Sequence, residues 1–371
     1  MADTENNKNF NSPAERAQGN APALRFTGFT EPWQRMTVSD LLEFYSTNSL
    51  SWEQLSKDTE SEFMNLHYGL IHVGLPTIVN IEENKLPYIK EDAIPRNYVL
   101  CENGDVSFAD ASEDTSEVAK AIEFTGIGNE KVISGLHTIH GRDKQKKTIV
   151  GFKGYLFSSE AFHKQTRRIA QGSKVFSISP RNFSEIFVSI PSKEEQRKIA
   201  ELLLLLDERI ATQRRLIDKL ETLIKGIVVS HFNNCKTKRT IAIKDLGKAY
   251  SVSNLSKDDL SEFGKPCIIY GELFTTYGCV ASEIQSRTDK YSQATLSKAG
   301  DLLFPASTTV DAISLIAPTS IKTDGVYVAG DMFGIHILPK FNSEYISYLL
   351  NYVYNRVLSK YAQGSTTMLF T

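Results

Sequence analysis

A repeating pattern of leucine and isoleucine predicts one long helix between Ser192 and His231. Apolar residues recur at alternating steps of four and three, which places them along one side of a helix as a seam that another helix can cover. Of the nine seam positions, eight are leucine or isoleucine, so we expect a helix of the coiled-coil type. The seam positions are Ile199, Leu203, Leu206, Ile210, Gln213, Ile217, Leu220, Ile224 and Ile227.

The start of this helix is marked by local signals. Ser192 and Glu195 have the spacing of a capping box, and Pro191 disfavours helical backbone in the residue before it. About 40 helical residues would span roughly 60 Å, far more than an ordinary globular helix. We therefore interpret residues 191–232 as a spacer.

The chain on one side of the helix repeats the chain on the other side. Three short strings recur in the same order, and each copy has a helix-like segment before the third string. This repetition predicts an α+β protein with two similar mixed α/β domains, at residues 23–190 and 233–371, joined by the long helix. The paired strings are Tyr68-Gly69 and Tyr270-Gly271, GDVSFADAS from Gly104 and GDLLFPAST from Gly300, and AQGS from Ala170 and from Ala362.

Shorter patterns predict further elements. Residues 1–22 are polar and small, which is typical of a disordered segment. Helix-like patches lie between Val38 and Leu55, and apolar stretches at 66–81 and 97–112 predict strands. Helices are expected over 158–170 and, in the second copy, over 346–361.

Composition limits the function classes. The 42 basic and 44 acidic residues leave a net charge of -2, so a DNA-binding surface must be built locally. No apolar run approaches the roughly 20 residues of a membrane span, and we expect a cytoplasmic protein. The cysteines form no C-x-x-C pair, which argues against a zinc site and against disulfides. They are Cys101, Cys235, Cys267 and Cys279.

Catalytic and cofactor motifs are weak. FTGIG, from Phe124 to Gly128, resembles the F-x-G-x-G loop of S-adenosylmethionine-dependent methyltransferases. It follows SEVAKAIE rather than an expected buried strand, and no N-P-P-[FY] motif accompanies it, so a simple turn is the better interpretation. His137 and His140 have no third ligand at helical spacing. We also find no phosphate-binding loop, nucleophile elbow or nuclease motif, and predict no catalytic residue and no metal ligand.

Basic residues near flexible glycines are the better candidates for a binding site, because lysine and arginine can reach DNA phosphates. Gln171 could also reach an adenine edge. The same AQGS turn follows a helix with basic residues in both copies. The candidates are Arg142, Lys144, Lys146 and Lys147 in a first loop, Arg167, Arg168, Gln171, Gly172, Ser173, Lys174 and Arg181 around the first AQGS turn, and Arg356, Lys360, Gln363, Gly364, Ser365, Thr366 and Thr367 around the second.

Taken together, LRFTGFTEPW, the repeated AQGS turn and IPSKEEQRKIAELLLLLDERIATQRRLIDKLETLIKGI resemble the specificity subunit of type I restriction-modification systems. The resemblance covers the chain beyond its polar start. It implies two target-recognition domains, each reading one half of a bipartite site on double-stranded DNA, and a helix that sets their separation and docks methyltransferase subunits. Restriction subunits would join through those, and S-adenosylmethionine, ATP and Mg²⁺ would be bound only by partner chains.

One departure from the family concerns the end of the chain. Family members usually have a second conserved helix after the second recognition domain, and this sequence stops at Thr371 before it. The expected consequence is an exposed seam, and therefore self-association or dependence on a partner. An alternative is a scaffold protein that dimerises through the helix and uses two repeated α/β domains to bind protein or sugar. Binding to random duplex DNA that weakens with salt would separate the two hypotheses.

Overall fold

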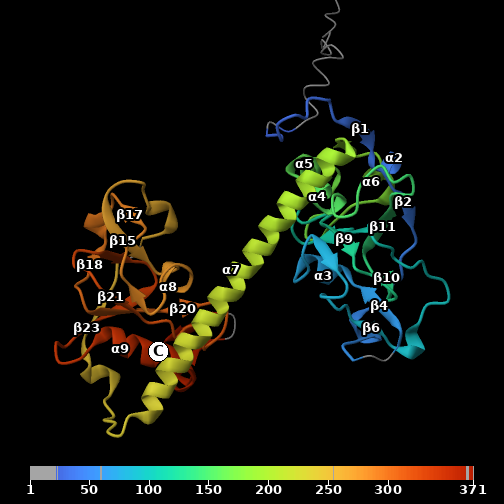
Figure 1. Ribbon diagram of the computed structural model, residues 1–371. Coiled ribbons are helices and arrows are strands. Elements are labelled where there is room, and N and C mark those ends of the chain that lie inside the picture. The colour runs from blue at the N-terminus through green and yellow to red at the C-terminus, as the bar shows by residue number, and fades with distance from the viewer. Residues whose placement is uncertain (1–21, 23, 59–60, 254, 365–366, 371) are drawn as a thin grey trace, which may run out of the picture. The chain divides into compact units, whose positions relative to one another are not determined.

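The computed structural model describes residues 22, 24–58, 61–253, 255–364 and 367–370. It divides into two compact units, Met1–Ala211 and Thr212–Thr371, here called unit 1 and unit 2. The long helix α7 (Lys193–Asn234) is continuous over 42 residues, which confirms the predicted helix and extends it by three residues (Figure 1). The expected disordered segment lies, apart from Pro22, outside the described residues. The domain boundaries proposed from the sequence remain predictions.

Each unit contains a five-stranded sheet with the same topology, which confirms the prediction of two similar α/β domains. In both sheets one edge strand is parallel to its neighbour, β5 to β9 and β16 to β21, and the remaining neighbours are antiparallel. In unit 1 the order is β2 (Glu43–Tyr45), β11 (Thr138–Arg142), β7 (Val106–Ala109), β9 (Ala121–Thr125), β5 (Ile78–Asn80). In unit 2 it is β14 (Gly247–Ser251), β23 (Met332–Ile337), β19 (Asp301–Pro305), β21 (Thr319–Ile321), β16 (Val280–Ala281).

A second sheet of four short strands accompanies the first in each unit. Each of these sheets contains one parallel pair, β4 with β10 at the edge in unit 1 and β15 with β22 at the centre in unit 2. In unit 1 the order is β10 (Lys131–Ser134), β4 (Phe63–Leu66), β6 (Tyr88–Ile89), β3 (Leu55–Ser56). In unit 2 it is β17 (Arg287–Thr288), β15 (Lys265–Ile269), β22 (Tyr327–Ala329), β18 (Thr295–Leu296).

Short helices and strand pairs complete the units. Unit 1 has the strand pairs β1 (Gln34–Thr37) with β13 (Phe187–Ile190) and β8 (Ala111–Ser112) with β12 (Phe176–Ser177). In unit 2, β25 (Met368–Phe370) pairs with β20 (Ser307–Thr308) and β24 (Ala362–Gln363). The α-helices besides α7 are α2 (Val38–Leu41), α3 (Tyr68–His72), α4 (Lys153–Phe157), α5 (Glu160–Ile169), α6 (Pro180–Ser184), α8 (Glu272–Thr275), α9 (Ser343–Tyr352) and α10 (Asn355–Leu358).

The main sheet of unit 1 is buried on both faces because its strands alternate between two apolar clusters. Phe108 packs with Phe157 of α4, Phe162 of α5 and Phe183 of α6 on one side. Ile122 belongs to the cluster on the other side, together with residues of β4 and β10. Burying large aromatic side chains on the helical side contributes a few kcal/mol each and fixes the helices on the sheet.

Several local expectations were wrong. The stretch at 66–81 contains α3 between two strands, because His67 Nδ1 accepts a hydrogen bond from the Gly69 amide and caps a turn of helix. The helix expected over 346–361 breaks between α9 and α10. FTGIG does adjoin a buried strand, because its Phe124 and Thr125 are the last residues of β9. Both of its glycines have positive φ, 60° at Gly126 and 55° at Gly128, so these glycines form a turn, as expected.

The start of α7 is fixed to unit 1 by two buried polar side chains. The Glu195 amide approaches Ser192 Oγ at 3.4 Å, which is one half of the expected capping box. The other half is missing, because the Glu195 carboxylate instead forms a bidentate pair with Arg25 at 2.6 and 2.8 Å. Gln196 accepts from the Ile149 amide at 2.9 Å and donates to the Pro191 carbonyl at 2.9 Å. These contacts join the helix rigidly to the sheet domain that precedes it.

Candidate nucleic-acid interface

The three repeated strings converge at one end of unit 1. The AQGS turn is closed by two hydrogen bonds between Gln171 and Ser177, at 2.8 and 2.9 Å. Ser177 pairs in turn with Ala111 of the FADAS string. The ring of Tyr68 lies 5.2 Å from that of His137, whose carbonyl accepts a hydrogen bond from the Asp110 amide. The sheet therefore brings segments far apart in the sequence to a single surface, which we call the turn end.

Unit 2 has the same arrangement. Gln363 pairs with Leu369, and Leu369 pairs with Ser307 of the FPAST string. Tyr270 donates its amide hydrogen to the Ala329 carbonyl, as Tyr68 donates to Leu136 in unit 1. A cavity of 650 Å³ is lined by Tyr270, Ser307 and other aromatic and hydroxyl side chains. The cavity lining contains no charged residue, but exposed Asp331 lies beside it and accepts a hydrogen bond from Ser307.

The two AQGS turns have the same backbone geometry. Gly172 has φ +142° and Gly364 has φ +132°. A Cβ at either position would lie 1.9 Å from the carbonyl oxygen three residues later, in Val175 or Thr367. Only glycine fits at either position. Residues 171–175 are exposed in unit 1, as are the described residues Gln363, Gly364 and Thr367 in unit 2.

We expect Gly172→Ala to destabilise the turn by about 1–3 kcal/mol, because the left-handed backbone and the Val175 carbonyl both oppose a Cβ. Hydrogen exchange of the Gln171 and Ser177 amides should become faster. Gly226→Ala is the matched control, since a Cβ there meets no atom within 4 Å and helix propensity favours alanine. Unchanged exchange at Gln171 would contradict the predicted strain.

The first basic loop lies at the opposite end of β11 from the turn end. Thr138 begins the strand beside His137, and Arg142 ends it about 14 Å away. Lys144 pairs with Glu43 at 2.6 Å, and Lys147 donates to the Asp40 carbonyl at 2.6 Å. The loop borders a cavity of 1120 Å³ whose lining also includes four carboxylates. The two basic groups of unit 1 are thus not one patch.

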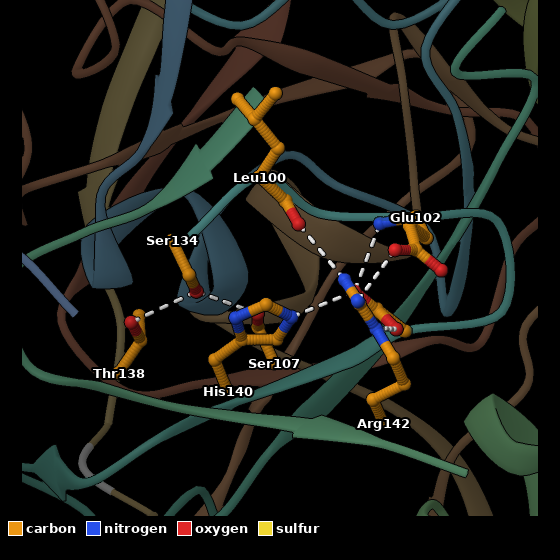
Figure 2. A network of polar contacts seen from close by, with 8 residues as sticks. Leu100, Glu102, Ser107, Ser134, Thr138, His140 and Arg142 are labelled. Atoms are coloured by element: carbon orange, nitrogen blue, oxygen red, sulfur yellow. Dashed lines mark hydrogen bonds and ion pairs between the residues drawn. The ribbon is translucent and has the colours of Figure 1, made fainter. Parts of the chain in front are cut away.

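Arg142 is held in a polar network at the start of β7 (Figure 2). Its Nε and Nη2 donate to the two oxygens of buried Asp105 at 2.8 and 2.7 Å. It also donates to Glu102 at 2.5 Å and to the Leu100 carbonyl at 2.8 Å. His140, fully buried, approaches Asp105 through Nε2 at 2.8 Å. With its donors engaged inside the fold, Arg142 is a poor candidate for a phosphate contact.

We call the network around buried Asp105 the aspartate lock of unit 1. Unit 2 has a corresponding lock around Asp301, with different partners. By strand register, Arg142 corresponds to His336 and His140 corresponds to Gly334. His336 Nδ1 lies 2.8 Å from Asp301 Oδ1, and Tyr250 donates its hydroxyl hydrogen to Asp301 Oδ2 at 2.9 Å. The Tyr250 ring occupies the space that a side chain at Gly334 would need.

In both locks the aspartate also accepts a hydrogen bond from a backbone amide three residues before it, that of Glu102 in unit 1 and that of Lys298 in unit 2. The aspartate therefore fixes the glycine turn that leads into the central strand.

The lock in unit 1 is unsuited to a metal ion, although Cys101, Asp105 and His140 offer three ligand atoms within 4.8 Å of one another. The Arg142 guanidinium already occupies both Asp105 oxygens, and its positive charge opposes a cation. Burial, followed by the nearby Asp105 carboxylate, raises the pKa of the Cys101 thiol well above its usual value. A thiol that stays protonated is a weak ligand.

Most of the other candidates from the sequence are exposed residues close in sequence to the AQGS turns. Arg167 forms an ion pair with Glu160 on its own helix. Two candidates, Ser365 and Thr366, lie outside the described residues. The exposed candidates are Arg168, Gln171, Gly172, Ser173, Lys174 and Arg181 in unit 1, and Arg356, Lys360, Gln363, Gly364 and Thr367 in unit 2.

The seam of α7 is only partly available to partners. Ile199 packs against the core of unit 1, and Leu203 is half-buried. From Leu206 onward the seam is exposed, and a second apolar row runs beside it through Leu202, Leu205, Leu216 and Leu223. The exposed fractions of these side chains are 40–63%. The apolar face is therefore wider than a simple two-helix seam. Its exposed members are Leu202, Leu205, Leu206, Ile210, Leu216, Ile217, Leu220, Leu223, Ile224 and Ile227.

Sequence reasoning missed Tyr68, Asp110 and His137 as members of the candidate surface. The sequence around His137 gives no signal for a binding role, because no metal ligand lies at helical spacing from it. The repeated strings contained the signal for the other two, since Tyr68 and Asp110 belong to strings that also occur in unit 2. Strings that recur in diverged copies can mark a shared surface as well as a shared fold.

No helix among the described residues is long and apolar enough to cross a membrane. No curated protein sequence matches the chain. A solved structure of a type I restriction-modification S subunit from M. genitalium is similar at 13% identity and a TM-score of 0.54, over 90% of this chain and 80% of that one. The similarity shows that the two proteins share a fold.

Two further solved structures have lower scores. One, described as the structural basis of complex assembly and conformational transition of the type I R-M system, has 13% identity and a TM-score of 0.45, with 89% and 82% covered. The HsdS subunit from Thermoanaerobacter tengcongensis has 14% identity and a TM-score of 0.38, with 92% and 83% covered. The family model for the type I restriction modification DNA specificity domain matches residues 30–222. With more than half of its length matched, the chain belongs to the type I restriction-modification DNA specificity family.

Proposed function

We propose that each unit of this chain reads one half of a bipartite site on double-stranded DNA, and that the turn end is the surface that meets the DNA. The observation that carries this proposal is the convergence of the same three strings at the same end of both units. An exposed two-stranded turn of this kind fits the major groove. Exposed Arg168, Lys174 and Arg181 supply positive charge on the α5–α6 side of the turn in unit 1.

In this proposal α7 separates the two readers and docks the partner subunits. A helix of this length spans about 60 Å, the length of about 17 base pairs. Its wide exposed apolar face favours packing against more than one helix, and we assign this face to the methyltransferase subunits, through which restriction subunits join. Self-association through the same face is the expected state without them. S-adenosylmethionine, ATP and Mg²⁺ are then bound by the partner chains.

A salt titration of duplex binding tests the DNA surface. Replacing Arg168, Lys174 and Arg181 with alanine should weaken binding and make the dependence of log K on log salt less steep by about 2–3, because each lost phosphate contact changes the slope by roughly 0.9. Alanine at Lys144, Lys146 and Lys147 should change the slope by less than about 1, since these residues lie at the far end of β11.

Two outcomes would contradict this assignment. A larger effect from the lysine loop than from the turn end would move the DNA surface to the Arg142 end of the sheet. Binding by the unmodified chain that does not change with salt would favour the scaffold alternative over DNA recognition altogether.

A further inference from the structure

The shared strings cannot by themselves give the two units different targets. Gln171 and Gln363 occupy equivalent places, as do Gly172 and Gly364, so they present the same chemistry to DNA. Contacts that are the same in both units suit the phosphate backbone, which positions a protein without specifying sequence. Side chains that differ at equivalent positions of the same surface are needed to tell two half-sites apart.

The strand register identifies one such pair, His137 and Asp331. Thr138 pairs with Ala109 in unit 1, and Met332 pairs with Pro305 in unit 2. The residue before each strand accepts the same backbone hydrogen bond: His137 from the Asp110 amide at 3.0 Å, and Asp331 from the Ala306 amide at 2.9 Å. Both residues are exposed. An imidazole in one unit is thus replaced by a carboxylate in the other.

Each of these side chains is held by a neighbour and leaves one polar atom directed away from that neighbour. His137 Nδ1 lies 3.1 Å from Asp110 Oδ1, which leaves Nε2 as the outer atom. In unit 2, Ser307 donates its hydroxyl hydrogen to Asp331 Oδ2, which leaves Oδ1 as the outer atom. Held side chains lose less rotamer entropy on binding, which favours discrimination between bases.

The distance from the AQGS turn suits reading within one groove. Two strand spacings separate Gln171 from Ala111, through Ser177, and Ala111 adjoins the Asp110 that contacts His137. Two spacings are about 10 Å, and the major groove is about 12 Å wide. A turn that contacts phosphates can therefore place His137 or Asp331 at base edges in the same groove.

We propose that His137 and Asp331 are specificity-determining residues, each reading one base pair in its own half-site; this inference rests on the proposed DNA function. Asp331 accepts hydrogen bonds and donates none, so it pairs with an exocyclic amino group, N4 of cytosine or N6 of adenine. The major-groove edges of guanine and thymine offer only acceptors and repel a carboxylate. His137 meets its base through Nε2.

The experiment uses the full chain assembled with its methyltransferase subunits and a library of duplexes randomised over the site. Asp331→Ala should reduce a roughly tenfold preference at one base pair to less than about twofold, leaving the other half-site unchanged. His137→Ala should do the same in the other half-site. Asp331→Asn keeps the size and should move the preference towards adenine, which pairs with an amide in two places.

Glu344→Ala is the matched control. Glu344 is a half-exposed acid at the start of α9, beside the Gly300 end of β19, and so lies at the other end of that strand from Asp331. It should leave the selected motif unchanged. Melting temperatures of all variants verify that the fold is retained, and a normal Asp331→Asn melt with an altered motif supports the inference even if Asp331→Ala unfolds.

Failure of the proposed DNA function and failure of this inference would give different results. If the unmodified complex selects no motif, the proposed DNA function fails and the inference fails with it. If it selects a bipartite motif that remains the same at every position in the Asp331→Asn and His137→Ala variants, the function stands and the inference is overturned.

Discussion

Replacing Asp105 with alanine should lower the free energy of unfolding of unit 1 by about 3–5 kcal/mol. The substitution removes the only carboxylate bonded to buried His140 and the main partner of Arg142 among the described residues, and it frees the Glu102 amide. Leaving donors buried without an acceptor is the costly part. Denaturant-dependent hydrogen exchange of β7 and β11 amides measures the change within the full chain, separately from unit 2.

Glu102→Ala is the matched control for this prediction. Glu102 contacts Arg142 from the solvent side, where its side chain is 66% exposed, so its loss should cost less than about 1 kcal/mol. Equal effects of the two substitutions would mean that burial does not determine the strength of this network.

The same aspartate should make unit 1 sensitive to acid. Burial alone would raise the Asp105 pKa, but hydrogen bonds from His140, Arg142 and the Glu102 amide outweigh it and hold the pKa below the usual value. A carboxyl with a lowered pKa in the folded state stabilises the fold above its unfolded pKa, and this stability is lost as the pH falls below about 4. The acid transition should be weaker in Asp105→Ala.

A double substitution of Leu206 and Leu220 with aspartate should abolish assembly with the methyltransferase subunits, with affinity falling by more than about a hundredfold. Both leucines are about half exposed on the apolar face of α7, and a partner helix that covers them would bury two unpaired charges. Size-exclusion chromatography of the mixed subunits, followed by a titration of the partner, measures the loss.

The control for α7 adds charge elsewhere on the same helix. Glu208 and Thr222 lie roughly half a turn around the helix from Leu206 and Leu220, at about 100° per residue. Glu208→Lys with Thr222→Asp should leave assembly intact. Normal complexes from the leucine double variant would show that the partners dock on another surface.

The sequence predicts the long helix α7 more completely than it predicts the tertiary contacts and the candidate surface. The heptad from Ile199 to Ile227 is a local, periodic signal, and the helix was predicted to within three residues at its end. The partner of Glu195 was not predicted, because Arg25 lies far away in the sequence and competes with the capping geometry. Local rules identify a helix start, whereas tertiary contacts decide where the carboxylate points.

The repeat could be recognised from the sequence, but the equivalence of His137 and Asp331 could not. The residue numbers of the strings around Gly104 and Gly300 differ by 196. Strand register pairs Thr138 with Ala109 and Met332 with Pro305, so the residue numbers of the neighbouring strands, β11 and β23, differ by 194. Aligning the histidines His140 and His336 would have paired the wrong positions. Loop lengths change between copies, and only strand pairing shows which residues correspond.

The two aspartate locks also bear on how such domains can be recombined. A histidine at position 334 would collide with the Tyr250 ring, since even a Cβ there would lie 2.2 Å from Cζ. In unit 1 the acid is held differently, because His140 contacts Asp105 directly whereas in unit 2 Tyr250 donates to Asp301. A chimera that places β14 of unit 2 beside β11 of unit 1, or β2 of unit 1 beside β23 of unit 2, would lose these contacts. A recombined domain keeps the lock only if both strands come from the same unit, either β2 with β11 or β14 with β23. Crossover points that preserve the fold therefore lie outside the segment that contains the pair.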